Sequence, residues 1–405
     1  MTTIALSEDM QTAATRAVFA ALEARGGKGC VRFVGGCVRN ALMRRPVSDL
    51  DLSTQLLPDE TEAALAAAGL KSVPTGKAFG TITAVVGGEP FEITSLREDV
   101  ETDGRRAVVK FTDDWTKDAQ RRDFYLNALY ADIDGLVYDP TGFGVADAQE
   151  GRVRFIGDAE QRIREDYLRI LRFFRFSAGY ASEIDAGSLA ACQALRGGID
   201  GLSGERVQQE LLKTFAVSDP VGVCRLMLAR DILVHVLPGL VFPSADLPVL
   251  TVMVAATDDP ERRLMALLSE ATALTVDALR GLQVRLRWST RLLVRLREAG
   301  EALAGLASGE GLHKLIYVYG RDAVVDALYL ASARTGESVD AAMADVLSFR
   351  VRMFPLKGSD LIARGMTAGP EVGQHLKQIE TDWVNHDFSQ SVIDEALDAL
   401  AKRPT

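Results

Sequence analysis

One short stretch near the N-terminus carries the residue types that metal-dependent chemistry on a phosphate needs. VGGCVRNALMRRPVSDLDL runs from Val34 to Leu52 and ends with Asp49 and Asp51, two carboxylates separated by one residue. In a β-strand, residues two apart point to the same face. Mg²⁺ prefers a few carboxylate oxygens completed by water and phosphate oxygens. The pair therefore predicts a Mg²⁺ site at Asp49 and Asp51, with an exposed turn at a strand end as the structural alternative.

The residues upstream of this pair suit a phosphate. Gly35 and Gly36 follow the apolar run VRFV and precede a short predicted helix. Glycine allows the backbone to approach a phosphate closely, and a helix N-terminus favours an anion. The planar guanidinium of Arg39 matches phosphate oxygens. The combination predicts a triphosphate-binding turn, whereas a structural glycine turn beside a solvent-exposed arginine is the alternative.

A second set of charged residues lies more than a hundred residues later, in REDYLRILRFFRF. In one continuous helix, its charged side chains would share one face and its apolar side chains another. The charged face would comprise Arg162, Glu165, Asp166, Arg169 and Arg172. Asp offers acceptors and Arg a fork of donors, so together they can match the hydrogen-bonding edge of a base. The segment predicts base recognition by the protein itself; salt bridges on a solvated helix are the alternative.

Strands and helices alternate in the region that must position the N-terminal residues. Strand-like runs occur at VRFVG, DLDLST, GTITAVV, PFEITSL, AVVKFT and LVYDP, with helical pieces at VRNALMRR and DETEAALAAAG. No GxGxxG follows the first strand, so nothing favours a dinucleotide-binding fold. Beyond Gly151 long helical patterns take over. The sequence predicts an α+β multidomain protein, in which an α/β head with a mixed sheet precedes all-helical segments.

Composition limits the partners that the protein can have. The chain has 405 residues, enough for two to four domains, and the net charge of −10 argues against a nucleic-acid partner. However, seven arginines stand against four acidic residues between Arg152 and Arg175. A local basic surface is therefore expected inside an acidic protein.

The sequence gives no sign of a membrane or a secretory route. No run of about 18 apolar residues occurs, and MTTIALSEDM lacks the basic and apolar regions of a signal peptide. The four cysteines are scattered without a CxxC pair, which argues against a zinc site or a disulfide framework. We expect a cytoplasmic protein with no membrane partner; the sequence does not indicate an oligomeric state.

The N-terminal motif resembles that of a known enzyme family. GGCVRN followed by SDLDL is similar to the GGxVRD…DxD signature of the class II tRNA nucleotidyltransferases, which include the bacterial CCA-adding enzymes and their poly(A) polymerase relatives in the polymerase-β-like superfamily. RRDFYLNAL resembles the family's RRDxxxNA motif, which contacts the ribose and triphosphate of the incoming nucleotide. The resemblance implies that Arg122 binds phosphate, and that Asp123 and Asn127 bind ribose.

Further segments extend the resemblance. The EDxxRxxRxxR spacing is similar to the motif that the family uses to choose the incoming base; it implies that Asp166 and Arg169 read the base and that Arg172 and Arg175 orient the helix or contact the nucleotide. PFEITSLRED resembles the strand after DxD, which makes Glu92 a candidate third catalytic carboxylate. GERVQQELLK resembles a segment that braces the neck.

One position departs from the family pattern. Asn40 stands where the family usually has Asp after the motif arginine. Asn lacks the charge of a normal metal ligand, so we assign this position no metal.

The resemblance also implies a domain plan and an activity. The plan is a catalytic head (1–145), a neck for base recognition (146–215), a body (216–340) and a tRNA-binding tail (341–405). The activity is template-independent addition of CCA to the tRNA 3′ end from CTP and ATP, with Mg²⁺ as cofactor and release of pyrophosphate. VPTGKAFGTITAVV and the expected flexible loop REDVETDGRRAVVKFTDD favour CCA addition. A poly(A) polymerase, a CC-adding enzyme, and an RNA-binding protein with an inactive head remain alternatives.

Overall fold

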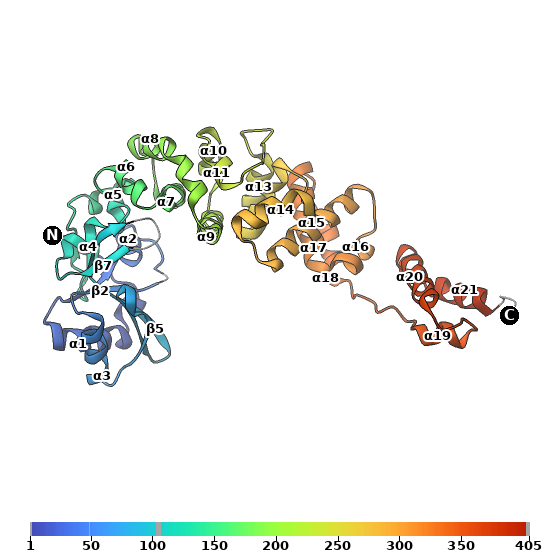
Figure 1. Ribbon diagram of the computed structural model, residues 1–405, viewed down its shortest axis with the longest axis horizontal. Helices are drawn as coiled ribbons and strands as arrows, with labels where there is room; N and C mark the ends of the chain where they lie inside the picture. The colour runs from blue at the N-terminus through green and yellow to red at the C-terminus, as the bar shows by residue number, and fades with distance from the viewer. Residues whose placement is uncertain (1, 48, 103–106, 402–405) are drawn as a thin grey trace. The chain divides into compact units, whose positions relative to one another are not determined.

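The computed structural model describes residues 2–47, 49–102 and 107–401, and the chain divides into two compact units. The first unit spans Met1–Leu237 and the second Pro238–Thr405. Figure 1 shows strands only toward the N-terminal end of the chain, followed by helices, as the sequence predicted.

The head of the first unit is built on a seven-stranded sheet. In spatial order its strands are β3 (Lys71–Gly76), β4 (Thr81–Val86), β5 (Glu89–Ser95), β2 (Asp51–Thr54), β1 (Val31–Val34), β8 (Tyr130–Ala131) and β9 (Val137–Tyr138). The pair β2–β5 is parallel and every other pair is antiparallel. The predicted mixed sheet is therefore confirmed.

Helices cover this sheet where their apolar residues can be buried. They are α1 (Ala13–Gly26), α2 (Gly36–Leu42), α3 (Pro58–Ala67), α4 (Trp115–Gln120) and α5 (Gly144–Glu150). In α1 the Thr12 side chain accepts a hydrogen bond from the Thr15 N–H at 3.0 Å, as an N-cap does. Phe19 of α1 then packs on Phe33 of β1, with ring centroids 4.8 Å apart. This contact fixes the strand whose end carries the glycine turn.

All six strand-like runs of the sequence form strands, but three further strands went unpredicted. These are β3, the two-residue β8, and β6 (Arg97–Thr102), which pairs with β7 (Ala107–Phe111) in a separate two-stranded sheet. The expected flexible loop falls on this β6–β7 pair, and its residues 103–106 lie outside the described residues.

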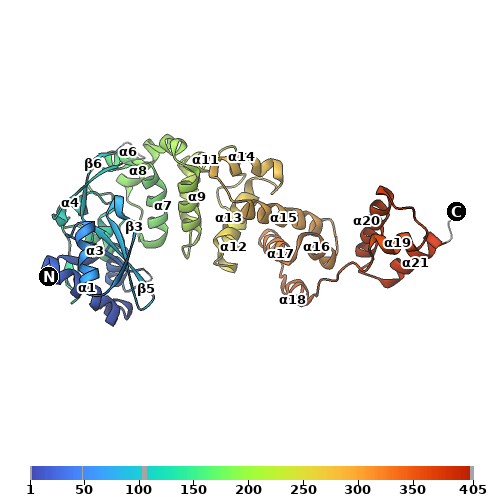
Figure 2. The same ribbon diagram turned by 60° about the horizontal axis from the view of Figure 1, so that its bottom comes forward.

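Helices complete the first unit. They are α6 (Ala159–Glu165), α7 (Leu168–Tyr180), α8 (Ala186–Ala194), the 3₁₀ segment η4 (Arg196–Gly201), α9 (Gly204–Phe215), α10 (Val221–Ala229) and α11 (Leu233–Val236). Figure 2 shows α7 beside α9. Ile170, Phe173 and Phe174 of α7 are fully buried, as the predicted apolar face requires.

The expectation of one helix from Arg162 to Arg172 is wrong. The helix breaks at Asp166, whose backbone is extended (φ −158°, ψ 105°) between the end of α6 and the start of α7. There the carboxylate Oδ1 accepts a hydrogen bond from the Leu168 N–H at 3.1 Å. Asp side chains compete with helical hydrogen bonding in this way, so the predicted base-reading residue lies in a turn between two helices.

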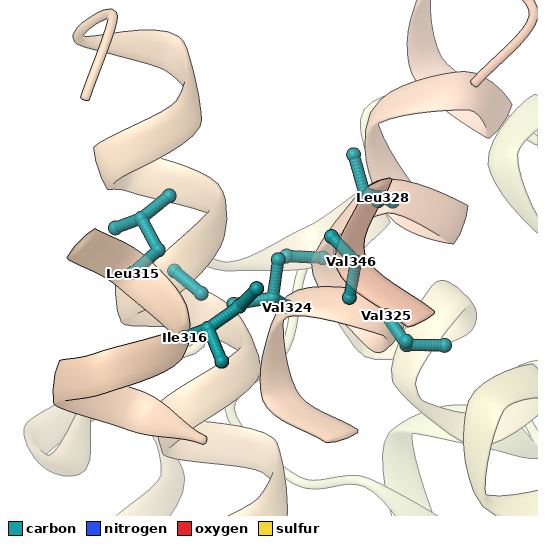
Figure 3. Close-up of a cluster of buried hydrophobic side chains, with 8 residues drawn as sticks. Leu315, Ile316, Val324, Val325, Leu328 and Val346 are labelled. Carbon is teal, nitrogen blue, oxygen red and sulfur yellow. The ribbon is translucent and has the colours of Figure 1, made fainter. Parts of the chain in front are cut away.

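The second unit is helical. Its elements are α12 (Pro248–Ala256), α13 (Pro260–Ala271), α14 (Val276–Leu286), α15 (Thr290–Ala307), α16 (Leu312–Tyr319), α17 (Arg321–Thr335), α18 (Asp340–Ser348), α19 (Gly358–Ala363), α20 (Pro370–Asn385) and α21 (Gln390–Ala401). One apolar cluster joins α15 to α18, and Figure 3 shows Leu315, Val324 and Val346 within it. A second cluster joins α19 to α21 around Trp383.

Two of the predicted domain borders can be compared with this packing. Helices α10 and α11, inside the predicted body, fall within the first compact unit. Val346 of α18, inside the predicted tail, packs with the body helices. The four-part division itself stays a prediction. In the described part of the chain, no helix is long and apolar enough to cross a membrane.

Candidate active site

The predicted carboxylates gather at the start of β2. Asp51 is the first residue of β2 and lies directly opposite Glu92 in the parallel register with β5. Asp49 precedes the strand, so the alternation rule does not place it. Loss of hydration raises the pKa of Asp51, and the negative charges of Glu92 and Asp49 raise it further, while Arg122 opposes them. The four charges therefore form one electrostatic cluster.

The glycine turn brings the backbone close to Arg122. Gly35 has φ +69°, a left-handed conformation that favours glycine, and its N–H donates to the Leu129 carbonyl at 3.0 Å. A Cβ at Gly35 would lie 3.7 Å from Nη1 of Arg122. Helix α2 starts at Gly36, one residue later. The turn, the helix start and Arg122 thus adjoin, as a phosphate site would require.

A buried aspartate that sequence reasoning missed holds Arg122 in place. Asp118 is 1 % exposed, and its Oδ2 accepts hydrogen bonds from the Arg122 Nη2 at 3.0 Å and the Tyr130 hydroxyl at 2.7 Å. Its Oδ1 accepts from the Arg121 Nε at 2.8 Å. Burial alone would raise the pKa of Asp118, but the charges of Arg122 and Arg121 outweigh this and hold it well below its usual range. The available sequence signal was the three- and four-residue spacing from Asp118 to these arginines.

Arg39 is buried, and its guanidinium makes four hydrogen bonds to three side chains. Its guanidinium donates to the Asn127 Oδ1 at 2.5 Å and to the Tyr180 hydroxyl at 2.7 Å. It also donates to the Asn40 Oδ1, at 3.1 Å from Nε and 2.9 Å from Nη2. The Asn40 amide in turn donates to the Pro46 carbonyl at 2.8 Å. Asn40 therefore orients Arg39 and ties α2 to the loop that leads to the aspartates.

Asp123 connects the head to α7. Its Oδ2 accepts a hydrogen bond from the Arg172 Nε at 2.7 Å and forms an ion pair with the Arg172 Nη2 at 2.5 Å. Its Oδ1 accepts from the Phe124 N–H at 2.9 Å and the Asn127 amide at 3.2 Å. Burial alone would raise the pKa of Asp123, but Arg172 and these hydrogen bonds lower it. Three hydrogen bonds and one ion pair therefore hold this carboxylate.

The predicted base-reading pair is held from several sides. Arg169 donates to the Glu165 carboxylate at 2.6 Å and to the carbonyls of Arg162 and Arg121 at 2.8 and 3.2 Å. Its Nε–H and one Nη2–H have no partner among the described residues, so two donors stay available. The Asp166 Oδ2 accepts from the Arg206 Nη2 at 2.6 Å.

Arg175, by contrast, joins α7 to α9. Its Nε donates to the buried Glu210 of α9 at 2.7 Å. Arg162 contributes in another way, because it donates to the Arg122 carbonyl at 2.7 Å and pairs with Glu165 at 2.6 Å. The predicted phosphate-binding and base-reading residues are therefore linked through the main chain of residues 121–122.

The donor set suits a hard divalent cation. Among the described residues, no three His, Cys, Asp or Glu side chains form a group that could hold a metal. Asp49, Asp51 and Glu92 nevertheless offer only oxygen ligands, which Mg²⁺ prefers together with water and phosphate. Loss of hydration is the main cause of the raised pKa of Asp51, and the negative charge of Glu92 adds to it.

Family models match two parts of the chain. Residues 31–154 match the poly A polymerase head domain. Residues 183–242 match the family described as the probable RNA and SrmB-binding site of polymerase A. The first match contains every predicted catalytic and phosphate-binding residue.

Whole-length relatives extend the similarity. The chain is 31 % identical over 387 residues to the mitochondrial CCA tRNA nucleotidyltransferase 1 of Mus musculus, covering 92 % of this chain and 86 % of that protein. It is 30 % identical over 356 residues to the CCA-adding enzyme of Lactobacillus delbrueckii subsp. bulgaricus, covering 85 % and 87 %. The fold is that of the Bacillus stearothermophilus CCA-adding enzyme in complex with CTP, with a TM-score of 0.75, 24 % identity, and 96 % and 98 % of the two chains covered.

Proposed function

Because this chain belongs to the CCA-adding tRNA nucleotidyltransferase family, we propose that it adds CCA to the 3′ end of tRNA from CTP and ATP, releasing pyrophosphate. The observation that carries the proposal is the link between the two halves of the site. Arg162 and Arg169 bond the carbonyls of Arg122 and Arg121, so the base-reading turn is fixed to the phosphate-binding segment. A protein that only binds RNA has no need for such a link.

The carboxylates supply the metal site in this proposal. Asp49 and Asp51 would hold Mg²⁺, with Glu92 beside them on β5. Bound Mg²⁺ supplies activation of an attacking hydroxyl and shielding of the triphosphate charge. The protein itself fixes the position of Glu92 relative to Asp51, because these two residues lie opposite each other in the parallel β2–β5 pair.

The remaining residues bind and orient the nucleotide. The Gly35–Gly36 turn, Arg39 and Arg122 hold the triphosphate, with Asp118 and Asn40 fixing the two guanidiniums. Asp123 and Asn127 serve the ribose, and the pairing of Asp123 with Arg172 holds this carboxylate beside α7.

Base selection falls to the turn between α6 and α7. Asp166 accepts a hydrogen bond from the exocyclic amino group that cytosine and adenine share, while the two available N–H groups of Arg169 meet ring acceptors. Arg172 and Arg175 orient α7 by pairing with Asp123 and Glu210. GTP and UTP present a carbonyl where Asp166 needs a donor, so they are rejected.

The proposal also gives the helical segments beyond the site a role in tRNA binding, and it places the protein in a reducing compartment. The segments 216–340 and 341–405 would grip the tRNA acceptor arm through phosphates and shape, so binding should weaken with salt. The four cysteines are unpaired and buried, which supports a reducing compartment such as the cytoplasm.

Nucleotide addition to a defined RNA tests the function. A tRNA ending at the discriminator base is given CTP, ATP, or both. Two additions with CTP and a third only with ATP would establish CCA addition. Long A tails on unrelated RNA would indicate a poly(A) polymerase, and addition of C alone a CC-adding enzyme. Equal activity of wild type and the Asp49→Ala/Asp51→Ala variant would overturn the catalytic assignment, and RNA binding without any addition would indicate an inactive head.

A further inference from the structure

The turn that carries Asp166 is packed against one glycine. Tyr167 follows Asp166, and its ring lies on Gly198 in η4, thirty-one residues later. A Cβ at Gly198 would lie 1.9 Å from Cδ1, 2.1 Å from Cε1 and 2.4 Å from Cγ of that ring. No real Cβ approaches another atom so closely, and Cγ sits at the base of the side chain rather than at a mobile tip. The ring therefore occupies the space that any other residue at 198 would need.

The segment around Gly198 is anchored and cannot easily give way. Ile199 is fully buried, and the Asp200 carboxylate contacts the His235 Nδ1 at 3.0 Å. The Gly198 N–H donates to the Leu195 carbonyl at 3.0 Å. Since the two residues that follow Gly198 are held in this way, a side chain at 198 would push the Tyr167 ring and, with it, the turn.

Displacement of Tyr167 would move the residues that read the base. The Tyr167 carbonyl accepts the Ile170 N–H at 3.1 Å, and the Asp166 carbonyl accepts the Arg169 N–H at 3.0 Å, so the first turn of α7 starts on these two residues. Asp166 and Tyr167 are consecutive, and Asp166 has the extended backbone that breaks the helix. A shift of Tyr167 thus reaches the Asp166 carboxylate and the Arg169 guanidinium together.

We propose that Gly198, by seating the Tyr167 ring, is a positioning residue that sets nucleotide selectivity. The inference rests on the proposed function, in which Asp166 and Arg169 read the base. In this proposal Gly198 acts through the Tyr167 ring and the geometry of the α6–α7 turn. Misplacement of a reading group by about 1 Å can cost on the order of 100-fold in rate.

The neighbouring glycine provides a matched control. A Cβ at Gly197 would meet nothing within 4 Å, and neither glycine has positive φ. Gly198→Ala and Gly197→Ala therefore differ only in whether the new methyl meets the ring. We expect Gly198→Ala to lower the preference for CTP and ATP over GTP and UTP by at least about tenfold, and Gly197→Ala to keep the wild-type preference.

The test measures two quantities in the full-length protein: binding of each of the four nucleoside triphosphates without tRNA, and kcat/KM for addition to tRNA. Loss of selectivity with an unchanged KM for tRNA supports the inference, whereas an equal loss for all four nucleotides, or no difference from Gly197→Ala, overturns it. Because the binding measurement needs no catalysis, it decides the inference even if wild type adds no nucleotide, an outcome that would instead refute the proposed function.

A double mutant separates seating from general damage. In a Tyr167→Ala background the ring is gone, so Gly198→Ala should change selectivity no further. If Gly198→Ala changes selectivity equally with and without the Tyr167 ring, Gly198 does not act through Tyr167 and the inference is wrong.

Discussion

The Arg206 guanidinium on α9 donates to the Oδ2 of Asp166 at 2.6 Å, forty residues away in sequence. Arg206 belongs to the segment that the sequence assigned to bracing. In the structure it contacts the carboxylate that we propose to read the base, and it occupies one lone pair of that carboxylate.

Replacement of Arg206 by alanine should therefore raise KM for CTP and ATP by about tenfold, the loss expected for one charge-assisted hydrogen bond. KM for tRNA should not change. Arg206→Lys, which keeps the charge, should recover part of the loss. Steady-state kinetics with each substrate varied in turn checks this, and equal increases in both KM values would contradict it.

Replacement of Asp118 by asparagine should destabilise the first unit by about 3 kcal/mol, because two arginines lose their buried charged partner. Addition activity should fall as Arg122 loses its anchor. Urea unfolding and kcat/KM measure the two effects. Asp113→Asn, a substitution at an exposed acid, serves as the control and should change neither.

Asp118→Asn should also make the stability of the protein less sensitive to acid. The pKa of Asp118 in the folded state lies below its ordinary value of 3.8. Its contribution to stability is therefore complete above pH 3.8 and is lost as pH falls toward the folded-state pKa. Unfolding free energies between pH 2 and 6 should fall less steeply for Asp118→Asn than for wild type; parallel curves would contradict the assignment.

Asn40 should tolerate replacement by aspartate but not by alanine. Both hydrogen bonds from Arg39 end on Oδ1, which Asp retains, so Asn40→Asp should stay within about threefold of wild-type kcat/KM. Asn40→Ala removes the orientation of Arg39 and should raise the nucleotide KM by about tenfold. A large loss of kcat/KM for Asn40→Asp would show that the hydrogen bond from the Asn40 side-chain amide to the Pro46 carbonyl matters more than the hydrogen bonds from Arg39.

His313 should make the second unit pH-dependent. Its Nε2 and Nδ1 lie 3.1 Å from carboxylate oxygens of Asp345 and Asp387. Desolvation lowers the pKa of His313, but these two carboxylates outweigh it and raise the pKa above 6.5. The stabilisation is thus complete below pH 6.5 and is lost as pH rises through the raised pKa. Thermal unfolding from pH 5 to 9 should show this loss in wild type and not in His313→Gln.

Motifs in the sequence predicted the parts of the site well but not the contacts between them. Strand patterns and short spacing predicted the sheet that carries the glycine turn and Asp51, whereas the resemblance to the family alone pointed to Glu92. Asp118 went unpredicted because its role depends on burial beneath Tyr130, which no local pattern reveals. The helix break at Asp166 was missed because the apolar periodicity continues across it, while one side-chain hydrogen bond decides the backbone.

The β2–β5 pairing also constrains how the protein acquires its site. The chain that joins Asp51 to Glu92 runs through α3 and the β3–β4 hairpin. Closing so long a segment is slow compared with forming local helices. A nascent chain that ends before β5 lacks Glu92, so the full carboxylate cluster can form only once β5 has been synthesised and has paired with β2.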